Sequence, residues 1–451
     1  MDTTSLNNGI DEALAMLHGL NPNISGSRKS DNSAQTGMRR HRLQKVVVAN
    51  RGEIAKRFFL ALHEEGIPSV AVVTDPDRGQ SWYEFADEVI FIGDQDHYAS
   101  IAVIIAVTLF VKANAIYSGY GFLSENMDFV LAVESMAELR GHEIIFMGPS
   151  HGTISMVGDK MNARGLARRH DIPLFESSDV IRNGDIETAA REAARIGYPV
   201  MVKPCSGGGG KGICRAANES ELSAAAASAA RIGLNLYRDP SFYLERYIRK
   251  PVHIEVQIFN GWAIGIRKCA VQRRNQKIIE ESGHAFLSDY VALSLLAAAE
   301  KIAELSGYSS GGGAGTVEFL IDTETGKFGF MEMNTRLQVE YAVTDQSLGI
   351  DIAKWQILFF DGREHEIVGL EKLKNRVSEN DHSIECRIYA EEPENDYLPS
   401  PGPIIELDLP TFNGIRCDFG FMEGDTILPM YDPMIGKLIA HGATRKEAMI
   451  R

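Results

Sequence analysis

The stretch FMEMNTRLQVEYAVTD, residues 330–345, has a polar side chain at every second position from 332 to 340. In an extended chain, alternate side chains lie on the same face, so these five should project together while the residues between them point the other way. The five are Glu332, Asn334, Arg336, Gln338 and Glu340. A solvated edge strand is the alternative, but such strands favour Lys, Thr and Ser. The series of carboxylate, amide, guanidinium, amide and carboxylate instead indicates a site that handles a metal and an anion together.

The same stretch is the second arm of a predicted hairpin, GAGTVEFLIDTETGKFGFMEMN at 313–334, built around the turn TETG. Counting outward from the turn sets Glu318 opposite Met331 or Glu332, depending on the turn type, so two carboxylates can converge from adjacent strands. A divalent cation would relieve their repulsion. With Asn334 nearby, the hard oxygen ligands favour magnesium or manganese bridging the phosphates of ATP.

A glycine loop, SGGGGKG at 206–212, is the first candidate for phosphate binding. It is not a P-loop, because Lys211 is followed by Gly212 rather than by Ser or Thr. The loop joins two short predicted strands, which suits a flexible flap that lays backbone N–H groups over a triphosphate; a plain flexible hairpin is the alternative. Lys160 and Lys203 could supply the charges that oxyanions need. Four glycines give high backbone entropy, so 207–210 should be poorly ordered without nucleotide.

A second polar hairpin, RKCAVQRRNQKIIEE at 267–281, places arginines, glutamines and Lys277 close together. Taken alone, these residues favour a charged surface hairpin without a special role.

Composition limits the class of protein. A chain of 451 residues should form two to four domains, and its net charge of −15 argues against a nucleic-acid partner. Its five cysteines are widely spaced and odd in number, which suits a reducing compartment and gives no zinc pattern. The longest apolar run, IAVIIAVTLFV at 101–111, is about half the length needed to cross a bilayer and should form a buried helix. No secretory signal is recognisable, so a cytoplasmic protein without membrane contact is expected.

Four segments of the chain differ in composition and in predicted secondary structure. Residues 1–42 hold one short amphipathic stretch and a polar run, and are expected to be a flexible extension. Residues 43–157 begin with a βαβ pattern and predict a parallel sheet, without the GxGxxG of a dinucleotide fold. Residues 158–375 predict an α+β domain with antiparallel pairs, and 376–451 a third domain whose last helix is short. The fold class is therefore mixed α/β and α+β.

Seven strings in this order resemble the biotin carboxylase component of biotin-dependent carboxylases: VANRGEIA, YSGYGFLSEN, GDK, VKPCSGGGGKG, QRRNQK, MEMNTRLQVE and ECRIYAEEP. The resemblance runs from about 44 to 451. It implies an ATP-grasp fold with a Rossmann-like N-terminal domain, a central domain carrying a glycine-rich lid, and a C-terminal domain that is truncated here. The implied reaction is the ATP- and bicarbonate-dependent carboxylation of biotin via carboxyphosphate, the first half-reaction of acyl-CoA or pyruvate carboxylases.

The resemblance also implies roles at matching positions. ATP would be held by Lys160, Lys203, lid residues Gly208, Gly209 and Gly210, hinge residues Glu245 and Ile248, and by His253 and Gln276. Magnesium or manganese would be held by Glu318, Glu332 and Asn334. Bicarbonate would be held by Arg336, Gln338 and the backbone of Val339, with Lys277 steadying it or carboxyphosphate. Glu340 would be the general base and Arg387 would stabilise the biotin enolate.

The chain departs from the family pattern at four places. Tyr341-Ala342 and Tyr117-Ser118 replace two His-Pro pairs, Asn275 replaces a histidine, and Arg246 replaces a lysine. Two other functions therefore compete with biotin carboxylation: another ATP-grasp ligase, and a degenerate nucleotide-binding scaffold of a carboxylase.

No AMKM-like biotinylation string is present. The expected partners are therefore a biotin carboxyl carrier and a carboxyltransferase on another domain or chain. A homodimer or a larger carboxylase assembly is expected as well.

Overall fold

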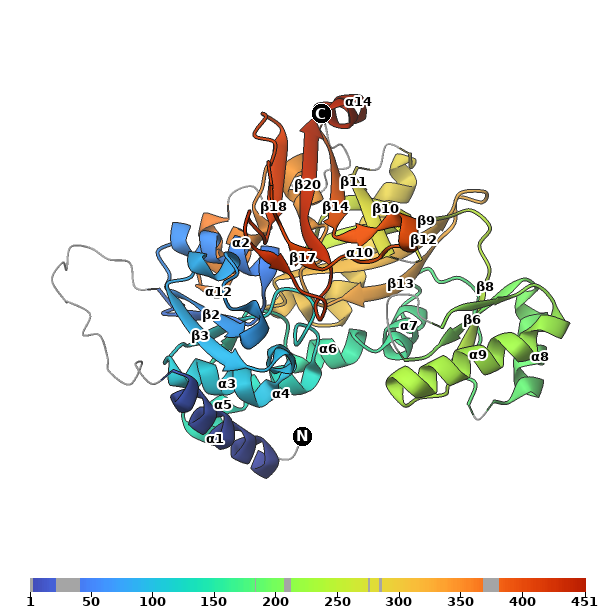
Figure 1. The fold of residues 1–451 in the computed structure, drawn as a ribbon. Coiled ribbons are helices and arrows are strands. Elements are labelled where there is room, and N and C mark those ends of the chain that lie inside the picture. Colours follow the sequence, from blue (N-terminus) through green and yellow to red (C-terminus); the bar gives the residue numbers. More distant parts are fainter. Residues whose placement is uncertain are drawn as a thin grey trace.

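The computed structural model describes residues 3–21, 41–182, 184–206, 212–274, 276–283, 286–367 and 381–451. Three regions follow one another along the chain: a parallel sheet with helices, a small lobe set apart from the rest, and a large antiparallel sheet (Figure 1). None of the described helices combines the length and the apolar character that a membrane span requires.

The first region is a parallel sheet, as the sequence predicts, and its strand order is β3-β2-β1-β4-β5. Its strands are β1 Val46–Val48, β2 Ser69–Thr74, β3 Glu88–Gly93, β4 Ala115–Tyr117 and β5 Ile145–Phe146. Its helices are α2 Gly52–Glu64, α3 Ile101–Phe110, α4 Met127–Glu134, α5 Met136–Arg140 and α6 His151–Val157. Helix α3 is the buried helix expected from the apolar run, since seven of its residues are buried.

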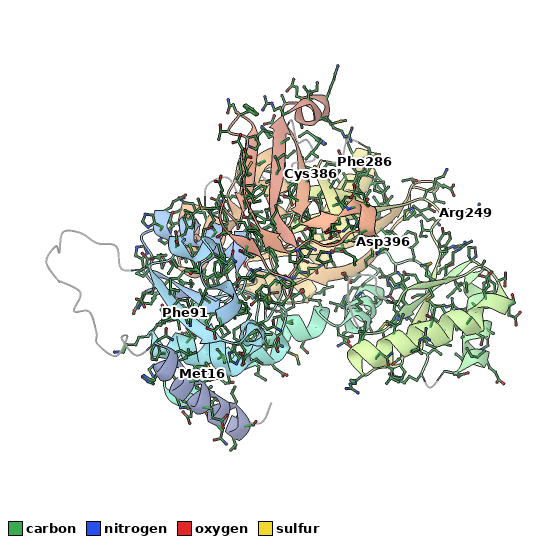
Figure 2. The ribbon with its side chains drawn as sticks, in the orientation of Figure 1. Met16, Phe91, Arg249, Phe286, Cys386 and Asp396 are labelled. Carbon is green, nitrogen blue, oxygen red and sulfur yellow. The ribbon has the colours of Figure 1, made fainter. Side chains whose placement is uncertain are left out.

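Residues 3–20 differ from the flexible extension expected for 1–42. They form helix α1, Thr3–Leu20, which packs on α3 and β3; Met16 of α1 and Phe91 of β3 mark the two elements in Figure 2. Leu6, Ile10 and Leu17 are buried at helical spacing. The reason is that α3 is apolar all round and needs a cover. The polar run at 22–40 lies outside the described residues.

The small lobe holds a three-stranded antiparallel sheet, β7-β6-β8, beside two helices. Its elements are β6 Val200–Pro204, β7 Cys214–Ala216, β8 Phe242–Arg246, α8 Ile186–Ile196 and α9 Glu219–Tyr237. The pairing of β6 with β7 confirms that the glycine loop joins two strands. The loop itself, 207–211, lies outside the described residues, as does Asn275, so the predictions for Gly208, Gly209 and Gly210 stay predictions. Helix α7, Lys160–Arg169, leads into this lobe (Figure 1).

Among the described residues, eight strands form one large sheet in the order β13-β12-β9-β10-β11-β14-β20-β18. They are β9 Pro251–Phe259, β10 Trp262–Arg273, β11 Gln276–Ser282, β12 Ala314–Asp322, β13 Phe328–Asn334, β14 His382–Tyr389, β18 Ile415–Phe419 and β20 Met434–Gly442. The sheet therefore continues across the boundary expected near 376, because β14 pairs with β11. Its helices are α10 Asp289–Leu305, α11 Tyr341–Leu348, α12 Ile352–Phe360 and α14 Arg445–Ile450. Two short ladders complete the chain, β15 Glu391–Glu392 with β16 Leu398–Pro399 and β17 Gly402–Pro403 with β19 Thr426–Ile427.

The register of the β12–β13 hairpin places Glu318 opposite Glu332, which decides between the two alternatives from the sequence. The expectation of one strand running to residue 340 is wrong. Strand β13 ends at Asn334, and residues 335–340 form an irregular loop that ends as the N-terminal cap of α11. The loop turns because Leu337 is buried in a core that also holds residues of β1 and α12, so the alternating polar residues meet through a turn rather than along a strand.

Candidate active site

A cleft of about 910 Å³ lies between the small lobe and the large sheet. Ten of the predicted site residues line it: Lys160, Lys203, Glu245, His253, Lys277, Glu318, Glu332, Asn334, Arg336 and Gln338. Two further predicted residues, Glu340 and Arg387, lie directly behind this lining and contact Lys277 or each other. Residues that lie far apart in the sequence therefore meet at one site.

Lys277 is the centre of the charge cluster. Its ammonium group donates to Glu255, to Glu318 at 3.0 Å and to Glu340 at 2.9 Å. Burial lowers the pKa of Lys277, but the three carboxylates outweigh it and hold that pKa well above its ordinary value. Lys277 is therefore charged at neutral pH, and the surface hairpin favoured by its local sequence is corrected: β10 and β11 lie inside the large sheet.

Glu318 accepts from Asn334 at 2.9 Å and from Gln338 at 2.8 Å, and its second oxygen lies 3.0 Å from His253 Nε2. Burial raises the pKa of Glu318, yet Lys277 and His253 hold it well below the usual range. In turn, burial lowers the pKa of His253 while Glu318 and Glu255 raise it to about 9. The structure thus keeps an ionised carboxylate at the base of the cleft.

The carboxylates fit a divalent cation. Glu332, opposite Glu318, pairs with the Lys160 ammonium at 3.0 Å. Each of the two carboxylates therefore already lies beside a cationic side chain. A second group, His253, Glu255 and Glu318, also brings ligand atoms within 4.8 Å of one another. There the Lys277 ammonium already neutralises Glu255 and Glu318, so a metal ion would compete with it. Two carboxylates and the Asn334 amide are the hard oxygen donors that Mg²⁺ or Mn²⁺ prefers.

Arg336 lines the cleft and is held by two acceptors. Its guanidinium donates to Glu125 at 2.8 Å and to the Asn334 side-chain oxygen at 3.2 Å. Glu125 belongs to the N-terminal region, and it also accepts from the backbone N–H of Thr335, in the loop at 335–340, at 3.0 Å. The contact joins the N-terminal region to the loop at 335–340.

Glu340 is held between two cations. Arg387 donates to it at 2.9 Å from one side and Lys277 from the other, and only 2% of the side chain is exposed. Burial and Glu255 raise the pKa of Glu340, but Lys277, Arg387 and the buried Arg267 outweigh them and lower it. Glu340 is therefore a carboxylate that can accept a proton. The neighbouring carbonyl of Val339 accepts from the ammonium of Lys437 on β20.

At the nucleotide end of the cleft, the predicted contacts Glu245 and Gln276 are engaged by neighbouring side chains. Glu245 does not present a free carboxylate, because Lys203 and Arg164 occupy its two oxygens, Arg164 at 2.7 Å. Burial raises the pKa of Glu245, but these two cations lower it. Gln276 does not line the cleft; its side chain accepts from Arg273 at 3.2 Å, whereas Gln272 does line it. Ile248 and Val339 are likewise absent from the lining.

Three residues of the site were missed from the sequence. Glu255 and Gln257 follow His253 at alternate positions of β9, and this polar alternation in HIEVQIF was the available signal. Arg267 on β10 is fully buried and donates to Glu255 at 3.0 Å, Thr316 at 3.0 Å and Gln338 at 3.2 Å. Nothing in its local sequence marks it as a site residue.

Comparison with known proteins supplies the family. Residues 42–154 match the family described as biotin carboxylase, N-terminal domain, 159–366 match the carbamoyl-phosphate synthase L chain, ATP binding domain, and 385–451 match the biotin carboxylase C-terminal domain. Biotin carboxylase 2 of Bacillus subtilis is 38% identical over 414 residues, covering 90% of this chain and 89% of the relative. The methylcrotonoyl-CoA carboxylase subunit alpha of Glycine max is also 38% identical, but this chain spans only 59% of its length.

Solved structures agree with these relatives. A biotin carboxylase of Campylobacter jejuni, solved as a beta-gamma-ATP complex, matches with a TM-score of 0.83 at 37% identity, over 90% of this chain and 89% of that one. The biotin carboxylase domain of the Hydrogenobacter thermophilus 2-oxoglutarate carboxylase, in complex with MgADP and bicarbonate, matches with a TM-score of 0.81 at 37% identity, over 90% and 87%. With an ATP-grasp architecture, a cleft of this charge pattern and these matches, the chain belongs to the biotin carboxylase family of ATP-dependent ligases.

Proposed function

We propose that this cleft uses ATP to activate bicarbonate and transfers the carboxyl group to biotin on a carrier, with roles for named residues. One observation carries the assignment: Glu340 is a buried carboxylate held between Lys277 and Arg387, next to the cleft residues Gln338 and Arg336. Bicarbonate is a weak nucleophile, so its activation needs a fixed base and nearby positive charge.

At the nucleotide end, Lys160 and Lys203 contact the phosphates as point charges, and the glycine lid covers them. Glu245 stays a predicted contact of the adenine-binding hinge, and its carboxylate fixes Lys203 and Arg164. Ile248, His253 and Gln276 stay predicted nucleotide contacts. Glu318, Glu332 and Asn334 would hold magnesium, which supplies charge neutralisation at the β- and γ-phosphates when bound.

At the bicarbonate end, Arg336, Gln338 and the backbone of Val339 hold the anion. Glu340 accepts its proton, and the freed oxygen attacks the γ-phosphoryl group, which gives carboxyphosphate and ADP. Lys277 stabilises the charge of the carboxylate and phosphate oxygens through this step.

At the acceptor end, Arg387 lies against Glu340 on the side away from Lys277. Carboxyphosphate breaks down to carbon dioxide and phosphate beside biotin. The released phosphate takes the proton of the ureido nitrogen, which then takes up carbon dioxide, and Arg387 stabilises the negative charge on the ureido oxygen.

Relatives of this chain include subunits of multi-subunit and multi-domain carboxylases. A biotin carboxyl carrier and a carboxyltransferase are accordingly the proposed partners, with a homodimer as the proposed assembly. Light scattering across micromolar concentrations tests the dimer, and a monomer throughout would contradict it. All five cysteines are free, which suits a cytoplasmic location. The proposed domain division is 43–157, 158–375 and 376–451.

One assay tests the function: ATP hydrolysis measured with and without bicarbonate, and with and without free biotin. A biotin carboxylase should hydrolyse ATP only with bicarbonate and magnesium, and biotin should stimulate it. Hydrolysis that depends on bicarbonate but ignores biotin would favour another ATP-grasp ligase. Nucleotide binding without any hydrolysis would favour a scaffold.

A further inference from the structure

Two glutamates face each other beside Arg387. Strand β11 pairs antiparallel with β14, and its register places Glu280 directly opposite Glu385; Cys386, labelled in Figure 2, marks this position on β14. Residues directly opposite in an antiparallel pair send their side chains to the same face. Both glutamates are completely inaccessible to solvent. Two ionised carboxylates in this position would repel each other without any water to screen them.

Three of the four oxygens in this pair have no hydrogen-bond partner among the described residues. They are both side-chain oxygens of Glu385 and Oε2 of Glu280. No ion pair of the described residues includes Glu385 either; the nearby Lys437 is engaged with Glu53 at 3.3 Å and with the Val339 carbonyl. An ionised carboxylate that is buried without a donor destabilises the fold, because it has lost its hydration and gained no hydrogen bond. A protonated one can donate to its neighbour.

The fourth oxygen connects the pair to the proposed active site. Glu280 Oε1 accepts from Arg387 Nε at 2.8 Å and lies 2.7 Å from Arg387 Nη2. The same Nη2 donates to Glu340 at 2.9 Å. Arg387 therefore has its orientation fixed by Glu280 on one side and by the base on the other.

We propose that Glu280 and Glu385 share one proton, with protonated Glu385 donating to Glu280 Oε2, and that this pair positions Arg387. Glu280 then keeps a single negative charge for the guanidinium, and the repulsion between the two carboxylates disappears. Both are positioning residues, because neither lines the cleft. The role of Arg387 toward biotin rests on the proposed function.

The electrostatic surroundings support a neutral partner in the pair. The charged groups that face it are Arg387 on β14, Lys277 on β11, Glu255 on β9, Lys437 on β20 and Glu340 at the start of α11. Burial raises the pKa of Glu280 to about 7, against the opposing effect of Arg387. Burial, together with Glu280 and Glu340, raises the pKa of Glu385 well above its ordinary value in spite of Lys437. A group with a raised pKa keeps its proton as the pH rises through the neutral range.

Glutamine substitutions separate the two members of the pair. Glu385→Gln keeps a neutral donor facing Glu280, so biotin-dependent turnover should be retained. Glu280→Gln removes the charge that holds Arg387, so the KM for free biotin should rise about 10- to 100-fold while the KM for ATP changes little. Glu281→Gln is the matched control, because Glu281 faces the other side of β11 and contacts Lys268 and His382. Its biotin kinetics should equal those of the unmodified chain.

The pH dependence gives a second readout. When the shared proton leaves at high pH, the two carboxylates repel each other, Glu280 moves from its place and Arg387 loses its orientation, so biotin-dependent turnover should fall. The amide introduced by Glu385→Gln has no proton to lose in this range, so the fall should move to higher pH in that variant. A pair with only a packing role would leave the pH profile unchanged.

Infrared difference spectroscopy tests the proton directly and needs no activity. The unmodified chain minus Glu385→Gln should show a protonated carboxyl band at neutral pH. Absence of that band in a folded protein would overturn the proposal, as would equal losses in Glu280→Gln and Glu385→Gln. Arg387→Met separates this failure from that of the proposed function. If Arg387→Met keeps normal biotin kinetics, the role given to Arg387 is wrong; if it loses them while Glu280→Gln does not, only the pairing is wrong.

Discussion

The molecule has two clusters of buried charged side chains near the start of α11, and only one of them faces the cleft. In the site cluster, Lys277 holds Glu255, Glu318 and Glu340 at the base of the cleft, and Lys160 holds Glu332 opposite Glu318. In the junction cluster, Arg416 on β18 donates to Asp345 at 3.0 Å and to Asp418 at 2.7 and 2.8 Å, and none of these three lines the cleft. Similar charges thus serve chemistry in one place and the packing of the C-terminal strands on α11 in the other.

The difference lies in how the carboxylates are satisfied. Asp345 and Asp418 both accept hydrogen bonds from the Arg416 guanidinium, and Asp345 also accepts from the backbone N–H of Ile352 at 3.0 Å. Their partners are therefore internal to the fold. In the site cluster, Glu332 has one ammonium and a quarter of its side chain exposed, so it keeps room for a ligand. Buried charge alone therefore does not identify an active site. A charged group that lines a cavity and keeps part of its surface free for a ligand does.

The largest effect should come from the proposed base. Glu340→Gln keeps the shape and the hydrogen-bonding reach of Glu340 but removes the carboxylate that accepts the proton of bicarbonate. Biotin-dependent turnover should fall about 10²- to 10⁴-fold, the usual contribution of a general base. ATP affinity, measured by calorimetry, should change little, because Glu340 lies behind the nucleotide contacts. Near-normal turnover would reject Glu340 as the base.

The junction cluster should respond in stability instead. Arg416→Met leaves Asp345 and Asp418 buried without their cation, which typically costs about 3–5 kcal/mol of unfolding free energy. Burial already raises the pKa of Asp345 to about 6 in spite of Arg416, so its charge tolerates little further loss of partners. Urea unfolding measures the change. A strong loss of turnover per folded molecule, without loss of stability, would show that the two clusters are not separate in function.

The sequence predicted which residues of the site pair with each other better than it predicted the course of the backbone that carries them. Turn counting placed Glu318 near Glu332 because a hairpin register is local. The strand expected to run to residue 340 was wrong because burial of Leu337, a tertiary effect, turns the chain after Asn334. Arg267 was missed for the same reason: its partners lie on β9, β12, α11 and the loop at 335–340 and leave no local pattern. Local periodicity predicts which residues share a face, but not where a distant core interrupts it.

A smaller effect is expected at the metal end of the site cluster. Glu332→Gln removes one proposed magnesium ligand. Loss of a residue that only supports a metal ligand lowers metal affinity roughly 10- to 100-fold. Loss of the ligand itself should therefore lower magnesium-dependent ATP affinity by at least that factor. Turnover should fall with it, whereas Glu340→Gln should affect turnover alone. With magnesium removed by a chelator, Glu332→Gln and the unmodified chain should bind nucleotide alike. A difference that persists without magnesium would assign Glu332 to the fold or to Lys160 rather than to the metal.

The smallest effect should come from the residue that joins the two clusters. Tyr341 follows the proposed base directly, its hydroxyl accepts from Arg416 at 3.3 Å, and the Lys437 ammonium lies 4.4 Å above its ring. Tyr341→Phe keeps the ring and its contact with Lys437 but removes the hydroxyl, so unfolding free energy should fall by about 1 kcal/mol, the net value of one hydrogen bond. Turnover should stay close to normal, because Lys277 and Arg387 hold Glu340 without the hydroxyl. Tyr341 stands where the family pattern has histidine, so a large loss of turnover in a stably folded Tyr341→Phe would show that this hydroxyl helps to place the base.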